Sequence, residues 1–307
     1  MKDLLMLFGV TLAKRYTNRQ KKVFFSQVEP FFTNLGYTVT VQENKKKWLR
    51  VFNILIGDIC KAQYIVLCPY DTPSKSLLPY TYYPYNLSKN LRQENQELFL
   101  RSLVYMTSCL VAYFMFKQYA NLNTFLKIAS IIFFVSLIVF CYWLIVGIPN
   151  SINFNRNSAS VALVASLASH TRGNGNVAYV LLDDTVSSNV GWRIFADDKN
   201  LKNKTIVYID CVSYGEKLVC AHSQAADHEA KKMVQCLSKL DLMDHVFTDK
   251  QLKDTNLQYF PVMLHLCSGT IEDHYFVVRN TRSRKDFKVD VSRLETLCEG
   301  LQKYLGE

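Results

Sequence analysis

Carboxylate side chains come directly after three short apolar runs of this sequence. The four are Asp71, Asp183, Asp184 and Asp210, and the runs are residues 64–68, 177–182 and 205–209. Apolar runs of this length, bounded by polar residues, are typical of buried strands. Because the carboxyl ends of parallel strands meet at one edge of a sheet, we expect these carboxylates to gather there. That edge is the candidate ligand cleft, and carboxylates in a cleft can bind cations or transfer protons.

The elements around these carboxylates alternate between strands and helices. β-Branched runs predict strands, and apolar residues at helical spacing predict helices. The predicted strands are residues 37–41, 48–56, 64–68, 177–182, 205–209, 218–221, 261–266 and 275–278, and the predicted helices are residues 157–170, 190–197, 225–240 and 291–305. This alternation favours an α/β fold, a three-layer sandwich around a mostly parallel mixed sheet. Residues 73–90, rich in proline, tyrosine and serine, are expected to form a loop.

Residues 102–148 contain no charged residue except Lys117 and Lys127, in a chain of 307 residues. The uncharged stretch 128–148 is long enough, at about 1.5 Å per residue, to cross a hydrocarbon core of about 30 Å. We therefore predict a transmembrane hairpin at residues 89–150, with spans at about 102–120 and 127–148. This prediction argues against a freely soluble enzyme. Residues 1–88 and 151–307 are then two parts of one soluble domain.

Charge predicts on which side of the membrane the soluble part lies. The net charge of +10 comes largely from residues 1–50, which hold ten Lys and Arg against three Asp and Glu. Because basic residues flank membrane spans on the cytoplasmic side, we expect a cell-membrane protein with a cytoplasmic domain. The nine cysteines agree with this side, because they are scattered and lack a C-x-x-C pair.

The N-terminal region carries apolar residues at helical spacing, which predicts an amphipathic helix or a helix pair. Its basic residues are expected to face anionic lipid headgroups, and they are Lys14, Arg15, Arg19, Lys21 and Lys22. Basic residues along one helix beside a membrane anchor do not favour a nucleic-acid surface.

Four short motifs occur in register with these elements. They are residues 65–72 (IVLCPYDT), 155–160 (NRNSAS), 177–193 and 208–215 (YIDCVSYG). In this order they resemble the zinc aminopeptidase family, which includes the glutaminyl cyclases and non-catalytic relatives. The resemblance covers most of residues 1–72 and 151–307, and it implies the aminopeptidase fold. In that family, two zinc ions are held by His and carboxylates, and a Glu acts as general base.

The metal-binding groups that this resemblance implies are replaced here. Pro69 stands at the position of the first His ligand, Arg156 at the bridging Asp, Thr185 and Val186 at the Glu pair, and Val212 at a further Asp. A guanidinium at the bridging position would repel both metal ions. We therefore expect no catalytic residue and no metal cofactor. Asp71 and Asn157 match the family, and each has a structural use, as a strand-end acceptor and as a helix cap.

These observations favour a pseudo-peptidase, a membrane-anchored non-catalytic protein that acts as a scaffold or accessory subunit. We expect Arg156 to pair with Asp71 or Asp183 and to fill the vacated site. We expect a peptide to bind in the cleft that corresponds to the substrate site of the family. The residues expected to line this cleft are Asp71, Arg156, Asn157, Asp183, Asp184 and Asp210. Small and polar residues in the spans permit close helix contact, so the hairpin is expected to dock to another integral membrane protein.

The alternative is an active membrane-bound metallopeptidase of the same family with an atypical zinc site. It requires side chains that can bind a metal to converge from Asp71, Asp183, Asp184, Asp210 and His274.

Overall fold

One mixed sheet of ten strands is the centre of the computed structural model, which describes residues 1–46, 49–186 and 189–306. The main strand order is β1-β2-β5-β3-β6-β9-β10-β4, while β7 pairs with β9 and β8 with β7. The strands are β1 (Val39–Lys46), β2 (Leu49–Ile56), β3 (Tyr64–Pro69), β4 (Thr81–Tyr82), β5 (Val177–Leu182), β6 (Thr205–Asp210), β7 (Lys217–Ser223), β8 (Leu242–Phe247), β9 (Met263–Glu272) and β10 (Tyr275–Arg279). Strands β5, β3, β6 and β9 are parallel neighbours, so the mixed sheet predicted from the sequence is present.

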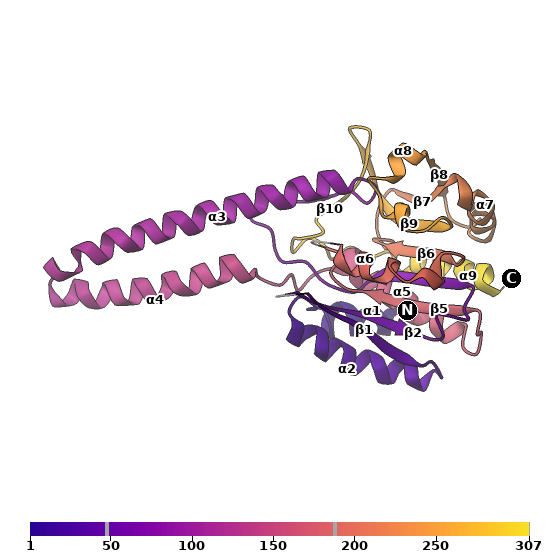
Figure 1. Cartoon of the computed structure of the whole chain (residues 1–307), viewed down its shortest axis with the longest axis horizontal. Coiled ribbons are helices and arrows are strands. Elements are labelled where there is room, and N and C mark those ends of the chain that lie inside the picture. The colour runs from indigo at the N-terminus through magenta and orange to yellow at the C-terminus, as the bar shows by residue number, and fades with distance from the viewer. Residues whose placement is uncertain (47–48, 187–188, 307) are drawn as a thin grey trace.

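Helices cover both faces of this sheet (Figure 1). The described α-helices are α1 (Lys2–Met6), α2 (Asn18–Asn34), α3 (Leu87–Gln118), α4 (Thr124–Val146), α5 (Ala159–His170), α6 (Val190–Ala196), α7 (Asp227–Cys236), α8 (Asp249–Leu252) and α9 (Val291–Gly306). Of these, α3 and α4 project from the sheet domain and do not cover the sheet. Alternate residues of β3 point to opposite faces, because side chains alternate along a strand. Val66 packs in the larger core with α1, α2, α5, α7 and α9, and Leu67 packs in the smaller core with α6.

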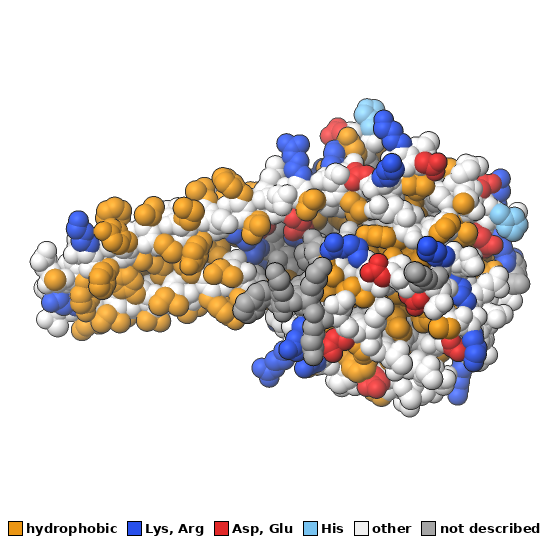
Figure 2. Space-filling view, in the orientation of Figure 1, with side chains coloured by type: hydrophobic (Ala, Val, Ile, Leu, Met, Phe, Trp, Pro, Cys, Tyr) orange, Lys and Arg blue, Asp and Glu red, His pale blue; other side chains and the backbone are white. Residues whose placement is uncertain are grey.

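Helices α3 and α4 form a hairpin that projects from the sheet domain (Figure 1). Both are long and apolar enough to cross a membrane. Figure 2 shows hydrophobic side chains along the visible face of the hairpin. Ser108 and Ser130 are buried, where small side chains let the two helices approach each other. Helix α4 ends at Val146, and its C-cap is Gly147, whose φ of +80° disfavours other residues.

Helix α3 begins at Leu87, well before the predicted start of the first span, so the expectation of a loop throughout 73–90 is wrong at its C-terminal end. The Asn86 side chain caps this helix by accepting from the Lys89 amide. The first turns of α3 are polar on one side and contact the domain, where Glu97 is buried. A hydropathy pattern marks only the apolar part of such a helix. The predicted span therefore begins later than α3 does.

The N-terminal region is a helix pair, α1 followed by the π-helical segment η1 (Leu7–Thr11), and then α2. Thr17 and Gln20 form a capping box at the start of α2. Lys14, Arg19 and Lys22 are exposed. Arg15 is fully buried and the Lys21 side chain is only 10% exposed, so the expectation that these two face lipid is wrong.

Candidate functional site

Arg156 and Asp210 form a buried ion pair at the carboxyl edge of the sheet. Arg156 Nη1 lies 2.5 Å from Asp210 Oδ1. The Tyr82 hydroxyl donates to Asp210 Oδ2 over 2.6 Å, and the Arg156 Cζ atom lies 3.9 Å from the centroid of the Tyr82 ring. The Cys211 thiol is a further donor, 3.3 Å from Asp210 Oδ1. Both carboxylate oxygens therefore have donors within the protein.

The expectation that Arg156 pairs with Asp71 or Asp183 is wrong. Arg156 lies in the segment η3 (Phe154–Ser158) that opens α5, and its guanidinium reaches the end of β6, where Asp210 is the last residue. Burial alone would lower the pKa of Arg156, but the Asp210 carboxylate raises it well above its usual value. The pairing with Asp210 therefore favours the charged form of the guanidinium.

A second carboxylate, Asp286, holds the backbone of η3 in place. Asp286 Oδ1 accepts from the Asn155 amide over 3.1 Å and Oδ2 from the Arg156 amide over 3.2 Å. Burial raises the pKa of Asp286 to about 8, against the effect of these hydrogen bonds. Asn155 Oδ1 in turn accepts from the Ser213 and Tyr214 amides. The loop that presents Arg156 is thus tied to the chain that follows β6.

Asp183 is paired with Lys21 from helix α2. Lys21 Nζ lies 2.6 Å from Asp183 Oδ1, and the Phe52 amide donates to Oδ2 over 3.0 Å. Burial raises the pKa of Asp183 to about 6, although the Lys21 charge opposes the shift. For Lys21, burial lowers the pKa but the charges of Asp183 and Asp71 outweigh it and raise the pKa. The ammonium therefore occupies one face of the Asp183 carboxylate.

Asp71 is held by the chain that follows Asp184. Its Oδ1 accepts from the Thr185 hydroxyl over 2.6 Å, and its Oδ2 accepts from the Thr185 amide over 3.1 Å and the Val186 amide over 3.2 Å. Asp184 has a φ of +48°, a left-handed conformation that Asp tolerates better than most residues. Asp71 therefore holds Thr185 and Val186 in place, shortly after the end of β5.

Arg15 fastens the N-terminal segment beneath this edge of the sheet. Its three guanidinium nitrogens donate to five acceptors at 2.5–3.2 Å. The acceptors are the carbonyls of Phe8, Leu12 and Tyr70 and the side chains of Asn153 and Ser158. Burial lowers the pKa of Arg15 to about 10, which still leaves it charged at neutral pH. Neutral acceptors therefore replace water around this buried cation.

Three further positions singled out in the sequence are apolar or unpaired in the structure. Pro69 ends β3 and pairs in register with Leu182 of β5, and Val212 is fully buried in the larger core. Asn157 was expected to cap a helix, but α5 has Ser158 at its N-cap position. Neither polar atom of the Asn157 side chain has a hydrogen-bond partner among the described residues. The expected helix-cap role of Asn157 is therefore wrong.

The carboxylates do not converge on a common metal-binding point. No group of three His, Cys, Asp or Glu among the described residues could hold a metal ion. Asp71, Asp183 and Asp210 are each bonded to donors of their own. His274 lines a separate cavity of about 440 Å³ beside Tyr275. The donor set at the sheet edge, with two cationic side chains bound to its carboxylates, does not fit zinc.

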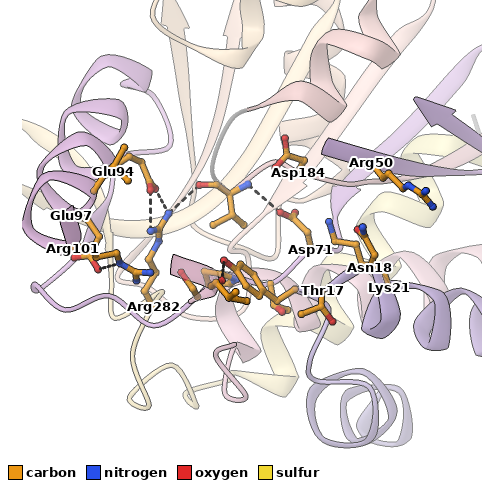
Figure 3. A pocket seen from close by; sticks show the side chains of 17 residues that line it. Thr17, Asn18, Lys21, Arg50, Asp71, Glu94, Glu97, Arg101, Asp184 and Arg282 are labelled. Atoms are coloured by element: carbon orange, nitrogen blue, oxygen red, sulfur yellow. Dashed lines mark hydrogen bonds and ion pairs between the residues drawn. The ribbon is translucent and has the colours of Figure 1, made fainter. Parts of the chain in front are cut away.

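A larger cavity of about 550 Å³ lies between this edge and the base of the hairpin (Figure 3). It is lined by Tyr16, Thr17, Asn18, Lys21, Arg50, Asp71, Thr72, Pro73, Ser74, Glu94, Glu97, Leu98, Arg101, Val146, Asp184, Val186 and Arg282. Figure 3 shows Glu94 beside Arg282 and Glu97 beside Arg101 on one side, with Lys21, Asn18 and Arg50 on the other. Of the expected cleft residues, Asp71 and Asp184 line it, whereas the Arg156–Asp210 pair does not.

Comparison with solved structures identifies the fold. A glutaminyl cyclase from Porphyromonas gingivalis superposes with a TM-score of 0.61 at 10% identity, covering 100% of this chain and 98% of the other. The chain has the fold of the glutaminyl cyclases and zinc-dependent aminopeptidases. A Zn-dependent exopeptidase from Parabacteroides distasonis gives a TM-score of 0.58 at 10% identity, covering 99% and 97%. A glutaminyl cyclase from Fimbriiglobus ruber gives 0.59 at 12% identity, covering 99% and 94%.

The aminopeptidase-like fold is therefore shown by structure, and the sequence resemblance to it is correct. Searches by sequence find no matching family model and no matching curated protein. At this level of identity the likeness concerns the fold alone.

Sequence reasoning missed several residues that build this edge of the aminopeptidase-like fold. Tyr82 belongs to a segment expected to be a loop, and Asp286 follows a basic run that gave no sign of burial. Lys21 was grouped with lipid-facing residues, although it lies three residues before Phe24 on the buried face of α2. That spacing was the one available signal, because residues three apart share a helix face.

Proposed function

We propose that this chain is a membrane-anchored, non-catalytic protein with an aminopeptidase-like fold that serves as a scaffold or accessory subunit of a membrane complex. The observation that carries the proposal is the Arg156–Asp210 ion pair, buried at the sheet edge and closed by Tyr82. By the resemblance described above, Arg156 stands where the family has its bridging Asp. In this proposal the guanidinium of Arg156, paired with the Asp210 carboxylate, takes the place of a metal ion there.

The other replaced positions support the same proposal. Thr185 and Val186 donate to Asp71 rather than offering carboxylates of their own, and Val212 lies in the core. General-base chemistry on a metal-bound water needs a carboxylate with free lone pairs beside the metal. These positions instead contribute a hydroxyl and backbone amides to Asp71, or an apolar side chain to the core.

Membrane anchorage is the second part of the proposal. Phe125, Ile138 and Ile145 of α4 are about 70% exposed or more, and the same is true of Phe116 in α3. Exposed apolar surface of this extent is unfavourable in water and favourable in hydrocarbon. Helix α4 has 23 residues, a length of about 35 Å, enough for a span. Residues 89–150 are then the membrane hairpin, and residues 1–88 and 151–307 the aminopeptidase-like domain.

The connection between the helices, η2 (Tyr119–Asn121) and two further residues, is too short to hold a domain, which supports a topology with the whole domain on one side. The excess of Lys and Arg in residues 1–50 supports the cytoplasmic side of the cell membrane. The partner of the hairpin in this proposal is another integral membrane protein. Ser108 and Ser130 are used within the hairpin, which leaves the exposed Ala129 and Ser136 for close contact with a partner.

Metal content and hydrolysis, measured on the same detergent-purified sample, test the non-catalytic assignment. We expect zinc and manganese well below one equivalent per chain by mass spectrometry, with no turnover of aminoacyl or N-terminal glutaminyl substrates. Near-stoichiometric zinc with turnover abolished by a chelator would establish the alternative, an active metallopeptidase with an atypical site. Extraction of native membranes with alkaline carbonate tests anchorage separately, since a spanning hairpin stays in the pellet.

A further inference from the structure

Five cations near the base of the hairpin have no ion-pair partner among the described residues, and we call them the basic rim. They are Lys14, Arg19, Lys22 and Arg50, which are exposed, and Lys75, which is half-buried. Several exposed cations elsewhere have a carboxylate partner, as Lys231 has in Asp227 and Arg279 in Glu272. Figure 2 shows Lys and Arg side chains on the domain beside the hairpin.

The sequence around the first three of these cations supplies no carboxylate. Residues 12–28 hold five Lys and Arg and no Asp or Glu. Of the five, Arg15 and Lys21 are bonded inside the domain. Arg19 and Lys22 lie three residues apart on α2 and therefore share its outer face. Like charges at this spacing repel each other, and an anion from outside the chain would relieve the repulsion.

Two hydrogen bonds fix the depth of the rim relative to the hairpin. The Tyr16 hydroxyl donates to the Val146 carbonyl over 2.8 Å, at the last residue of α4. The Lys75 amide donates to the Ile148 carbonyl over 2.8 Å, just beyond that end. If α4 spans the hydrocarbon core, as in the proposed function, the segments that carry Tyr16 and Lys75 lie in the headgroup layer.

The other cations of the rim lie close to these two segments. Lys14 and Arg19 are two and three residues from Tyr16, which is at most about 7–11 Å of extended chain. Lys22 follows Arg19 by one helical turn. Arg50 lines the 550 Å³ cavity that Tyr16 also lines (Figure 3). All five are therefore within reach of headgroups at the membrane surface.

Exposed apolar side chains lie beside the rim and indicate what covers it. Leu77, Leu78, Leu98 and Phe99 are 42–72% exposed. The amides of Leu77 and Leu78 donate to the Glu97 carboxylate, which holds their loop against α3. Binding at a membrane interface combines buried apolar area with attraction of cations to anionic lipids. These side chains therefore favour a lipid surface over an acidic protein as the occupant.

We propose that the basic rim binds the phosphate groups of anionic phospholipids in the adjacent leaflet, so that the domain rests on the membrane surface. Guanidinium and ammonium groups are both suited to phosphate. Because the rim is cationic, it selects phosphatidylglycerol or phosphatidylserine over the zwitterionic phosphatidylcholine. The proposal rests on the membrane anchorage proposed above and adds a second attachment of the domain to the membrane.

Lysine acylation of the full chain in lipid nanodiscs tests this. A neutral N-hydroxysuccinimide acetate modifies Lys14, Lys22 and Lys75, and peptide mass spectrometry gives each rate separately. Discs of phosphatidylcholine are compared with discs of equal parts phosphatidylcholine and phosphatidylglycerol. We expect each rate to fall about fivefold in the anionic discs, since one basic residue near an anionic surface contributes roughly that factor. At about 1 M salt, where the Debye length is about 3 Å, the protection should be lost.

Lys202 and Lys303 are the internal controls for the acylation. Both are exposed, and Lys202 lies just before β6. Lys303 lies in the last turn of α9, where the Leu305 carbonyl accepts from the Asn174 side chain ahead of β5. The two lysines are therefore at the amino edge of the parallel strands, away from the hairpin. Their rates should be the same in both kinds of disc.

Substitution of the rim tests whether its cations hold the lipid. The chain is extracted from vesicles of equal parts phosphatidylcholine and phosphatidylglycerol, and mass spectrometry measures the ratio of the two lipids retained. We expect phosphatidylglycerol to be enriched on wild type and on a control triple variant, but not on a rim triple variant of equal charge change. Glutamine keeps the helix propensity of the residues that it replaces. The rim variant is Lys14→Gln, Arg19→Gln and Lys22→Gln, and the control is Arg172→Gln, Lys202→Gln and Lys303→Gln, all exposed positions.

Equal acylation of the rim lysines in the two kinds of disc would overturn the proposal. An enrichment that survives in the rim variant, or that is lost equally in both triple variants, would overturn it as well. Protection by polyglutamate in phosphatidylcholine discs, without protection by phosphatidylglycerol, would make the rim a docking surface for an acidic protein instead. Carbonate extraction reports on anchorage independently, so failure of one proposal is distinguishable from failure of the other.

Discussion

The hydroxyl of Tyr82 and the carboxylate of Asp210 are joined by a 2.6 Å hydrogen bond across 128 residues of sequence. Tyr82 lies in β4, the two-residue strand that pairs with β10 just before α3 begins. The segment that leads into the hairpin therefore covers the ion pair of Arg156. The contact links the base of the hairpin to the carboxyl edge of the sheet.

Replacement of Arg156 by Met should destabilise the protein strongly. Asp210 would remain buried without its cation, which typically costs about 3–5 kcal/mol. The double variant Arg156→Met with Asp210→Asn should recover most of this loss, because no unpaired charge remains. Urea unfolding followed by tryptophan fluorescence in detergent measures both. Arg279→Ala, at the exposed pair with Glu272, is the control and should change little. A loss in Arg156→Met no larger than in this control would contradict the expectation.

Tyr82→Phe should remove one hydrogen bond to a charged group and keep the ring over Arg156. We expect a loss of about 1.5–3 kcal/mol in the free energy of unfolding. Tyr83→Phe is the matched control, because no described hydrogen bond involves the Tyr83 hydroxyl and its ring contact with Lys89 persists. Equal stabilities of the two variants would show that the Asp210 contact does not stabilise the fold.

Asp286 should make stability depend on pH between neutral and alkaline conditions. Its pKa is about 8 in the folded protein and about 4 when unfolded. The folded state therefore binds the proton more tightly, and the stability it contributes below pH 4 is lost as pH rises through 8. We expect wild type to lose roughly 1 kcal/mol more than Asp286→Asn between pH 7 and 9. Parallel profiles, measured by urea unfolding at each pH, would refute the assignment.

His265 should make stability depend on pH in the opposite direction, in the acidic range. Burial lowers its pKa to about 4, below the value of about 6.5 in an unfolded chain. Its neutral form is favoured by folding, so stability falls as pH drops from 6.5 towards 4. Neither ring nitrogen has a hydrogen-bond partner among the described residues, and the ring lies between Tyr85 and Tyr208.

His265→Phe should therefore match or exceed wild-type stability at pH 7 and gain about 2 kcal/mol on it at pH 5. Thermal unfolding at the two pH values measures the difference. The exposed His228 supplies the control, since His228→Phe should leave the pH profile unchanged. A fall in stability for His265→Phe at both values would mean that the imidazole makes a contact that Phe cannot replace.

The central strands could be predicted closely because they are buried on both faces. Predicted strands 177–182 and 205–209 match β5 and β6 to within one residue. Strand β8 could not be found this way, because Asp244 and His245 are exposed in it and its pairing with β7 supplies the stability. The predicted strand 48–56 begins outside the described residues, and from residue 49 onward it matches β2.

The site was predictable in its residue types but not in its pairings. The carboxylates at the strand ends were found, since a strand end is a local feature of sequence. Arg15 and Lys14 are adjacent basic residues, yet one is fully buried and the other exposed. Which of the two is buried depends on Asn153 and Ser158, which lie more than 130 residues away. No local pattern contains that information.

Helix α3 has mechanical consequences because it continues without proline or glycine from Leu87 to Gln118. A helix without a kink site transmits bending along its length. From Leu87 to Arg101 it is roughly 20 Å long, so a tilt of about 10° about Arg101 would displace its start by about 3–4 Å. That shift exceeds the tolerance of the bonds from Leu87 and Ser88 to Asp254. The hairpin thus acts as a lever arm. The tilt of α3 relative to the domain determines the strain on the hydrogen bonds of its first turn and on the adjoining strand β4.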